Sequence, residues 1–318
     1  MKKILKWSGY GLLTILALGF IWGYEADIEL DTLKAKYATP PSQFIKVADL
    51  DVHYRREGTA RLDSLPVVLI HGTGASLLTW NGWTDSLKND YQVIRLDLPA
   101  YGLTGSNADH NYSLDYYADF LGQFLDKLGV KKCVLGGNSL GGAVAWTFAL
   151  KYPARVGKLI LIDAAGYPMQ SKSVPITFQM ARLPVVNQLF TKITPRAVVE
   201  GSIKNVYANP SKVTPELVDQ YWDMAKRAGN RAAFMARMSA AKTPDSTWQQ
   251  IKTLTMPTLI MWGAQDLLIP IGIARRFEAD LPNDTLVVYD NLGHVPMEEN
   301  PAETVKAVKS FLVKNNKI

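Results

Sequence analysis

The stretch from residue 134 to residue 142, Val-Leu-Gly-Gly-Asn-Ser-Leu-Gly-Gly, constrains the fold of this chain more than any other. It begins as a typical buried strand, and the Ala-rich residues 143–151 after it predict a helix. Gly137 and Gly141 flank Ser139 at two residues on either side, which lets the helix pass close to the strand. The serine hydroxyl then projects above the sheet edge, beside the free N–H groups of a helix N-terminus. This arrangement favours nucleophilic attack on a carbonyl.

Composition excludes several other classes of protein. The 318 residues are 47% hydrophobic, enough for one large domain or a domain with an insertion. The net charge of +6 comes without a Lys/Arg block, so it indicates a solvated surface and no nucleic-acid partner. The single cysteine, Cys133, excludes an internal disulfide, and no Cys/His cluster has metal-ligand spacing. We expect no metal or organic cofactor.

Apolar runs alternate with helical patterns over most of the chain, which predicts an α/β fold with a mainly parallel sheet covered by helices on both faces. The expected core comprises residues 44–165 and 251–318. Its expected strands cover residues 44–47, 50–56, 66–71, 91–96, 133–138, 158–163, 256–262 and 285–289.

This alternation of strands and helices stops between residues 166 and 250, where no apolar run typical of a strand occurs. Aromatic residues and methionines recur there at helical spacing, and prolines punctuate them. We therefore expect an inserted group of short helices. Its apolar side chains either pack the insertion onto the core or line a substrate pocket.

The sequence of residues 1–24 predicts a membrane anchor. Three lysines precede an uncharged run over residues 7–24, which is long enough to cross most of a bilayer, and aromatic residues lie near both of its ends. A cleaved signal peptide is the rival interpretation, but no A-x-A site follows. Residues 1–24 are thus expected to form an uncleaved, single-pass transmembrane helix, and residues 25–43 a polar stalk. The lysines would be cytoplasmic and the body extracytoplasmic, which is periplasmic in a bacterium.

Ser139 needs a base, and the base needs an orienting carboxylate. Asp266 and His294 each follow a separate expected strand, and in a parallel sheet the carboxyl ends of the strands meet at one edge. Their order along the chain is the one that this kind of turn predicts. Asp163, at the end of the strand after the serine turn, is the rival acid.

At these residues the chain resembles the α/β-hydrolase superfamily, from about residue 44 to the end. The resemblance rests on His71-Gly72, Asp97-x-Pro99-x-x-Gly102, Gly137-Asn138-Ser139-Leu140-Gly141, Gly263-x-x-Asp266 and Gly293-His294. It implies that Ser139 is the nucleophile, His294 the general base and Asp266 the orienting acid. It also implies an oxyanion hole formed by the backbone N–H groups of Thr73 and Leu140, and makes the insertion the family's lid domain.

A serine at the turn argues against the epoxide hydrolases and haloalkane dehalogenases of the superfamily, which need a carboxylate there. The sequence therefore predicts a carboxylic-ester hydrolase, and an anchor near lipid points to an acylglycerol or another lipophilic ester as the small-molecule substrate. The enzymatic alternative is a carbon–carbon bond hydrolase of the meta-cleavage type. The alternative from a different class is a catalytically silent hydrolase fold that binds a ligand or a protein.

Overall fold

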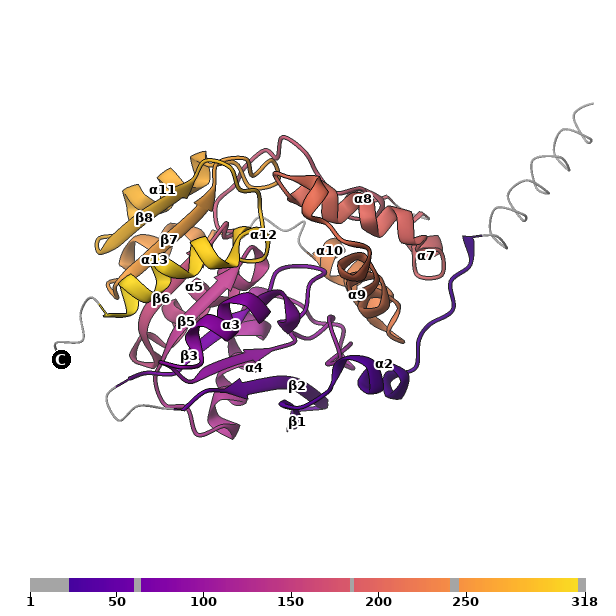
Figure 1. Ribbon diagram of the computed structural model, residues 1–318, viewed down its shortest axis with the longest axis horizontal. Coiled ribbons are helices and arrows are strands. Elements are labelled where there is room, and N and C mark those ends of the chain that lie inside the picture. Colours follow the sequence, from indigo (N-terminus) through magenta and orange to yellow (C-terminus); the bar gives the residue numbers. More distant parts are fainter. Residues whose placement is uncertain (1–22, 60–63, 184–185, 241–245, 314–318) are drawn as a thin grey trace, which may run out of the picture.

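The computed structural model describes residues 23–59, 64–183, 186–240 and 246–313. Its centre is an eight-stranded sheet in the order β1-β2-β4-β3-β5-β6-β7-β8 (Figure 1). β2 runs antiparallel to both of its neighbours, and all other pairs are parallel. The strands are β1 Ser42–Val47, β2 Leu50–Glu57, β3 Val67–Ile70, β4 Val93–Leu96, β5 Cys133–Asn138, β6 Val156–Ile162, β7 Thr258–Gly263 and β8 Asp284–Tyr289. The predicted α/β-hydrolase fold is confirmed.

Helices cover both faces of this sheet. On one face, Phe124, Phe148 and Phe277 from three different helices join a single apolar cluster with the strands. On the other face, Trp83 and Val308 pack against the same strands. The helices of these two layers are α3 Asn81–Leu87, α4 Leu114–Lys127, α5 Leu140–Lys151, α11 Gly272–Asp280, α12 Pro296–Glu299 and α13 Pro301–Val313. Short 3₁₀ helices lie at η1 Leu77–Trp80, η2 Pro153–Arg155, η3 Pro210–Lys212 and η4 Thr247–Thr253.

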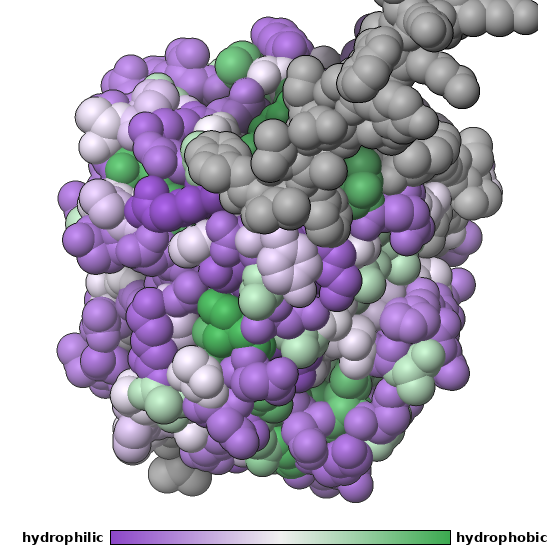
Figure 2. Space-filling model, turned by 90° about the vertical axis from the view of Figure 1, so that its right-hand side faces the viewer, coloured by the Kyte–Doolittle hydropathy of each residue, from purple (hydrophilic) through white to green (hydrophobic). Residues whose placement is uncertain are grey.

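Among the described residues, five α-helices lie between β6 and β7, in the segment 166–250 that we call the insertion. They gather beside the edge of the sheet where the parallel strands end, to the right in Figure 1. Figure 2 views the molecule from that side, where hydrophilic residues predominate and hydrophobic ones form small separate patches. The helices are α6 Ile176–Ala181, α7 Val186–Phe190, α8 Arg196–Val206, α9 Pro215–Lys226 and α10 Asn230–Ala240.

The structure differs from the expected polar stalk. The N-terminal segment (residues 23–41) contains helix α2 Leu30–Tyr37 and lies against the insertion. The N–H of Glu25 donates to the carbonyl of Lys192 over 2.9 Å, and the N–H of Ile28 to that of Lys226 over 2.8 Å. Glu25 and Asp27 of the expected stalk instead form ion pairs with Lys226 and Arg231 of the insertion.

The predicted transmembrane anchor is contradicted. No helix within the described ranges is both long and apolar enough to cross a bilayer. This finding also overturns the membrane-anchored, extracytoplasmic location that followed from the anchor. At the described end of the apolar run, Tyr24 forms an antiparallel β-bridge with Ile193 of the insertion. Tyr24 therefore contacts the folded protein. Residues 1–22 of the predicted anchor lie outside the described residues.

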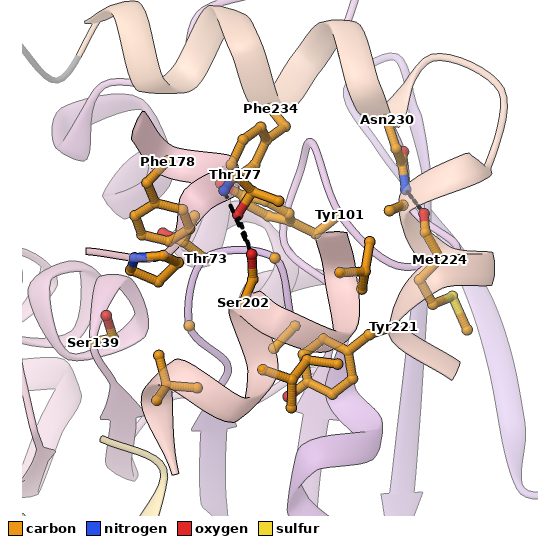
Figure 3. Close-up of a pocket in the computed structure, with 18 of the residues that line it drawn as sticks. Thr73, Tyr101, Ser139, Thr177, Phe178, Ser202, Tyr221, Met224, Asn230 and Phe234 are labelled. Carbon is orange, nitrogen blue, oxygen red and sulfur yellow. Dashed lines mark hydrogen bonds between the residues drawn. The ribbon is translucent and has the colours of Figure 1, made fainter. Parts of the chain in front are cut away.

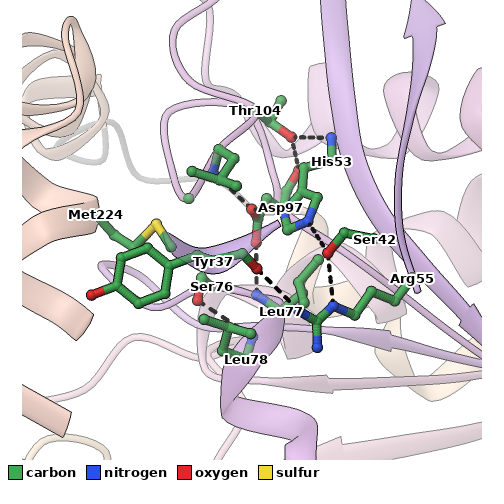
Figure 4. Close-up of polar contacts among 12 residues, drawn as sticks. Tyr37, Ser42, His53, Arg55, Ser76, Leu77, Leu78, Asp97, Thr104 and Met224 are labelled. Carbon is green, nitrogen blue, oxygen red and sulfur yellow. Dashed lines mark hydrogen bonds and ion pairs between the residues drawn. The ribbon is translucent and has the colours of Figure 1, made fainter. Parts of the chain in front are cut away.

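A buried polar network joins the first two strands to loops of the core (Figure 4). The side chain of His53 in β2 is fully buried. Its Nδ1 lies 2.7 Å from Asp97 Oδ2, and its Nε2 lies 2.9 Å from the hydroxyl of Ser42. Asp97 also accepts the backbone N–H groups of Leu77 and Leu103. The network thus joins β1, β2 and the loops that follow β3 and β4.

The contacts of this network favour the charged form of Asp97. Burial alone would raise the pKa of the Asp97 carboxyl, but His53, His71 and the donated N–H groups hold it below the ordinary value of 3.8. A carboxyl with a lowered folded pKa stabilises the fold above its unfolded pKa. That contribution is lost as the pH falls through the folded pKa.

The substitution His53→Ala is therefore expected to lower the free energy of unfolding by about 3–5 kcal/mol, because it leaves Asp97 buried without its partner. Urea unfolding at neutral pH measures the change. The control is His110→Asn at an exposed histidine, which is expected to change the free energy of unfolding by less than about 0.5 kcal/mol. Equal effects of the two substitutions would contradict the role given to His53.

Candidate active site

Ser139 lies at the sharp turn between β5 and α5. Its φ of 54° and ψ of −115° are a strained conformation for a residue with a side chain. The flanking glycines permit the turn sterically. A Cβ on Gly137 would lie 2.2 Å from the backbone of Gly141, and a Cβ on Gly141 would lie 2.1 Å from the carbonyl oxygen of Ile70. The close approach of helix and strand thus requires both glycines, as the motif predicts.

His294 and Asp266 come together at the same edge of the sheet. Nδ1 of His294 lies 2.7 Å from Oδ2 of Asp266, and both side chains are buried. The other carboxylate oxygen accepts the N–H groups of Leu268 and Ile269 over 2.8 and 2.9 Å. Asp266 is therefore fixed by the turn after β7 and in turn fixes the imidazole ring. His294 and Ser139 both line one cavity.

Asp163, the rival acid, lies beside this pair. Its Oδ1 accepts the N–H of Gly263 over 3.0 Å, and no hydrogen bond to His294 occurs among the described residues. Burial, and then the charge of Asp266, raise the pKa of Asp163 well above its ordinary value. The carboxyl of Asp163 therefore favours its protonated form.

Among the described residues, the side chains of Asp163, Asp266 and His294 also have ligand atoms close enough together to hold a metal ion. One atom each from Asp163, Asp266 and His294 lies within 4.8 Å of the others. However, the hydrogen bond from His294 Nδ1 to Asp266 Oδ2 already uses one ligand atom of each. This geometry matches an orienting acid and its histidine.

The residues of the two expected oxyanion donors, Thr73 and Leu140, lie near Ser139. Leu140 is the first residue of α5, where backbone N–H groups have no partner within the helix. Thr73 follows Gly72, where a Cβ would lie 3.2 Å from Cβ of Ser139. Thr73 also lines the cavity. The loop after β3 is therefore held close to the serine.

His71 holds this loop in place. The fully buried ring accepts the N–H of Leu98 at Nε2 over 3.0 Å, so its proton is on Nδ1, which lies 2.7 Å from the carbonyl oxygen of Gly72. Burial lowers the pKa of His71 and favours this neutral form. His71 therefore has a positioning role and is not a second base.

The cavity has a volume of about 140 Å³ and extends from Ser139 and His294 into the insertion. Apolar side chains supply most of its wall, and Figure 3 shows Phe178 and Phe234 facing it. A polar pair interrupts this wall, because the hydroxyls of Thr177 and Ser202 lie 3.1 Å apart. The site is thus an apolar chamber with a serine at one side.

Sequence reasoning missed two positioning residues. The Asn138 side chain donates to the carbonyl of His294 over 2.9 Å and so ties the histidine loop to β5. Glu299 accepts the N–H groups of Gly293, Ala208 and Asn209 over 2.9–3.1 Å, which joins the histidine loop to the insertion. The only signal for either was proximity in sequence to Ser139 or His294.

Comparison with known proteins gives a consistent family. A sequence model described as alpha/beta hydrolase fold matches residues 66–301. A crystal structure of a membrane phospholipase A, a bacterial virulence factor, is 25% identical with a TM-score of 0.74, and the match covers 98% of each chain. An esterase from Thermogutta terrifontis is 26% identical with a TM-score of 0.70, covering 85% of this chain and 97% of that one.

A third relative has a different activity. The 2-hydroxy-6-oxononadienedioate/2-hydroxy-6-oxononatrienedioate hydrolase of Burkholderia vietnamiensis is 28% identical over 289 residues. The match covers 85% of this chain and 95% of that protein. Ester hydrolysis and this other hydrolysis thus both occur among proteins similar to this chain.

Proposed function

Since the chain belongs to the α/β-hydrolase fold family, we propose that it is a serine hydrolase that cleaves carboxylic esters through an acyl-enzyme on Ser139. The observation that carries this proposal is the hydrogen bond between His294 and Asp266. His294 lines the same cavity as Ser139. A nucleophile, a base and an orienting acid then meet at one place.

The proposed reaction has two steps. The Ser139 oxygen attacks the ester carbonyl while Nε2 of His294 takes the hydroxyl proton, and the alcohol leaves with that proton as the C–O bond breaks. Water then gives a proton to His294 and attacks the acyl carbon, and the acid leaves as the proton returns to Ser139. Among the described residues no hydrogen bond joins Ser139 to His294, a common finding in hydrolases without substrate.

Two further roles belong to the proposal. The N–H groups of Leu140 and Thr73 would stabilise the negative charge that develops on the carbonyl oxygen, at about 3 kcal/mol for each donor. Asp266 would keep the proton of His294 on Nδ1, so that Nε2 faces the serine. Asp163 would remain a neutral carboxylic acid beside Asp266.

The substrate is proposed to carry a lipophilic acyl group. The wall beyond Ser139 is mostly apolar, and Val199 and Ile203 from α8 contribute to it. The similarity to a phospholipase A supports the same substrate class. Each methylene that such a wall buries contributes about 0.8 kcal/mol, which is about fourfold in kcat/KM.

The test is a series of p-nitrophenyl esters of increasing acyl length, with Ser139→Ala as the blank. We expect kcat/KM to rise with length until the cavity is filled. Ile203→Trp is expected to shorten the preferred acyl chain and to lower the ratio of long-chain to short-chain turnover by at least about tenfold. Ala197→Trp, at an exposed position of the same helix, is the matched control and should leave this ratio unchanged.

A series with no Ser139-dependent turnover would refute the ester proposal. The second candidate would then be hydrolysis of a carbon–carbon bond, which the Burkholderia relative favours. Turnover of a meta-cleavage product tests it directly. A folded protein that acts on neither substrate would support the silent binding role.

A further inference from the structure

An arginine lies in the wall of this mostly apolar cavity. Arg231, in the first turn of α10, lines the cavity with Asn230, and only 4% of its side chain is exposed. In Figure 3, Asn230 and Met224 lie on the opposite side of the cavity from Ser139. A buried guanidinium at that end is unexpected if the cavity accepts only hydrocarbon.

The N-terminal segment satisfies only part of this guanidinium. Nη2 of Arg231 donates to a carboxylate oxygen of Asp27 over 2.6 Å and to the carbonyl of Glu25 over 2.7 Å. In the part of the chain that the structure describes, Nε and Nη1 are buried and have no hydrogen-bond partner. These two nitrogens carry three of the five N–H bonds of the group. Most of the hydrogen-bonding capacity of Arg231 is therefore unused.

The charges around Arg231 also fail to balance. Lys226 pairs with Glu25 over 3.3 Å, and Lys192 lies 3.7 Å from the same Asp27 that pairs with Arg231. Among the described residues, these ion pairs join three cations to two carboxylates, and three minus two leaves one positive charge. Arg231 is the most deeply buried of the three cations. An anion entering the cavity would neutralise the excess.

Asn230 adds a second unused atom at the same end. Its Nδ2 donates to the carbonyls of Gly102 and Met224 over 3.0 and 2.7 Å, which fixes the orientation of the amide. Its Oδ1 is buried and lacks a partner among the residues described. An acceptor beside unused donors suits a group with both an oxyanion and a hydroxyl, or an oxyanion with one bound water.

We infer that Arg231 and Asn230 form an anion-binding subsite, and that the preferred substrate is an ester with a second, anionic group remote from the scissile bond. This inference rests on the proposed ester hydrolysis and names its substrate class. The shared chemistry is an oxyanion, supplied by a carboxylate or by a phosphate. The apolar wall between Ser139 and Arg231 would hold the hydrocarbon that links the two groups.

The test compares p-nitrophenyl esters in matched pairs of equal chain length. One member ends in a methyl group, and the other ends in a carboxylate or, in a separate arm, a phosphate. For the wild type, the ratio of kcat/KM of the anionic member to that of the neutral one is expected to exceed about 10 at the best chain length. A ratio of one or less at every length, in both arms, overturns the inference without any variant.

Variants assign the preference to Arg231. Arg231→Gln is expected to lower the ratio by about 10- to 100-fold, whereas Arg231→Lys should retain part of it. The matched control is Arg237→Gln on the same helix, which is not part of the cavity wall and should leave the ratio unchanged. An unchanged ratio in a folded Arg231→Gln protein, checked by thermal unfolding, would overturn the assignment.

A binding measurement separates this inference from the proposed function. If no ester is cleaved, the ester proposal fails, and calorimetry with the Ser139→Ala protein still tests the subsite. The probes are a straight-chain monocarboxylate and the uncharged primary alcohol of equal length. Tighter binding of the monocarboxylate that is lost with Arg231→Gln would support the subsite, and equal binding of the two probes would overturn it.

Discussion

The Ser139→Ala protein is expected to hydrolyse p-nitrophenyl esters with a kcat about 10⁵- to 10⁶-fold lower than the wild type. The substitution removes the oxygen that would form the acyl-enzyme, and the remaining donors and histidine act only on water. Stopped assays at saturating ester measure the difference. Ser310→Ala, at an exposed position of α13, is the control and should retain wild-type kcat.

A loss smaller than about 100-fold would contradict the role of Ser139. The ester would then be cleaved by another group, or by water that His294 activates directly. Thermal unfolding of the Ser139→Ala protein is expected to match the wild type or exceed it. Alanine makes the same strained turn at φ 54°, but it buries no hydroxyl.

The second large effect is expected at the acid. Asp266→Asn should lower kcat by about 10⁴-fold, because an amide no longer holds the proton of His294 on Nδ1. Asp163→Asn should lower kcat by less than about tenfold. Its Oδ1 still accepts the N–H of Gly263, and an amide has nearly the shape of the protonated carboxyl that it replaces. Steady-state kinetics of both variants with one ester give the comparison.

The two substitutions control each other, since the carboxyl groups lie side by side and differ mainly in their contact with His294. The opposite order, with Asp163→Asn the more damaging, would make Asp163 the orienting acid. Equal losses would indicate that the pair acts as a unit that shares one proton.

The arrangement around Ser139 was predictable because its requirements are local. The turn needs glycines two residues on either side of the serine, because a Cβ atom at either position would clash with the backbone. Asp266 and His294 were predictable for a topological reason, since each follows a parallel strand and all such strands end at one edge. A pattern of strands and turns is therefore enough to bring these residues together.

What the sequence did not predict depends on contacts between distant segments. The charges of Glu25 and Asp27 suggested solvent exposure, but their partners lie about 200 residues away in the insertion. The burial of His53 depends on Asp97, 44 residues along the chain. An alternating strand pattern does not reveal such a pair. Arg231 was likewise an ordinary helical cation until the fold placed it in the cavity wall.

The central claim is that Ser139 is a nucleophile that becomes acylated. The most direct test treats the folded protein with a fluorophosphonate, which mimics the ester and forms a stable bond to an activated serine. Mass spectrometry of the digested protein is expected to find one label, on the peptide that contains Ser139, and no label in the His294→Ala protein. A folded wild-type protein that stays unlabelled at Ser139, or takes up the label at another residue, would contradict the claim.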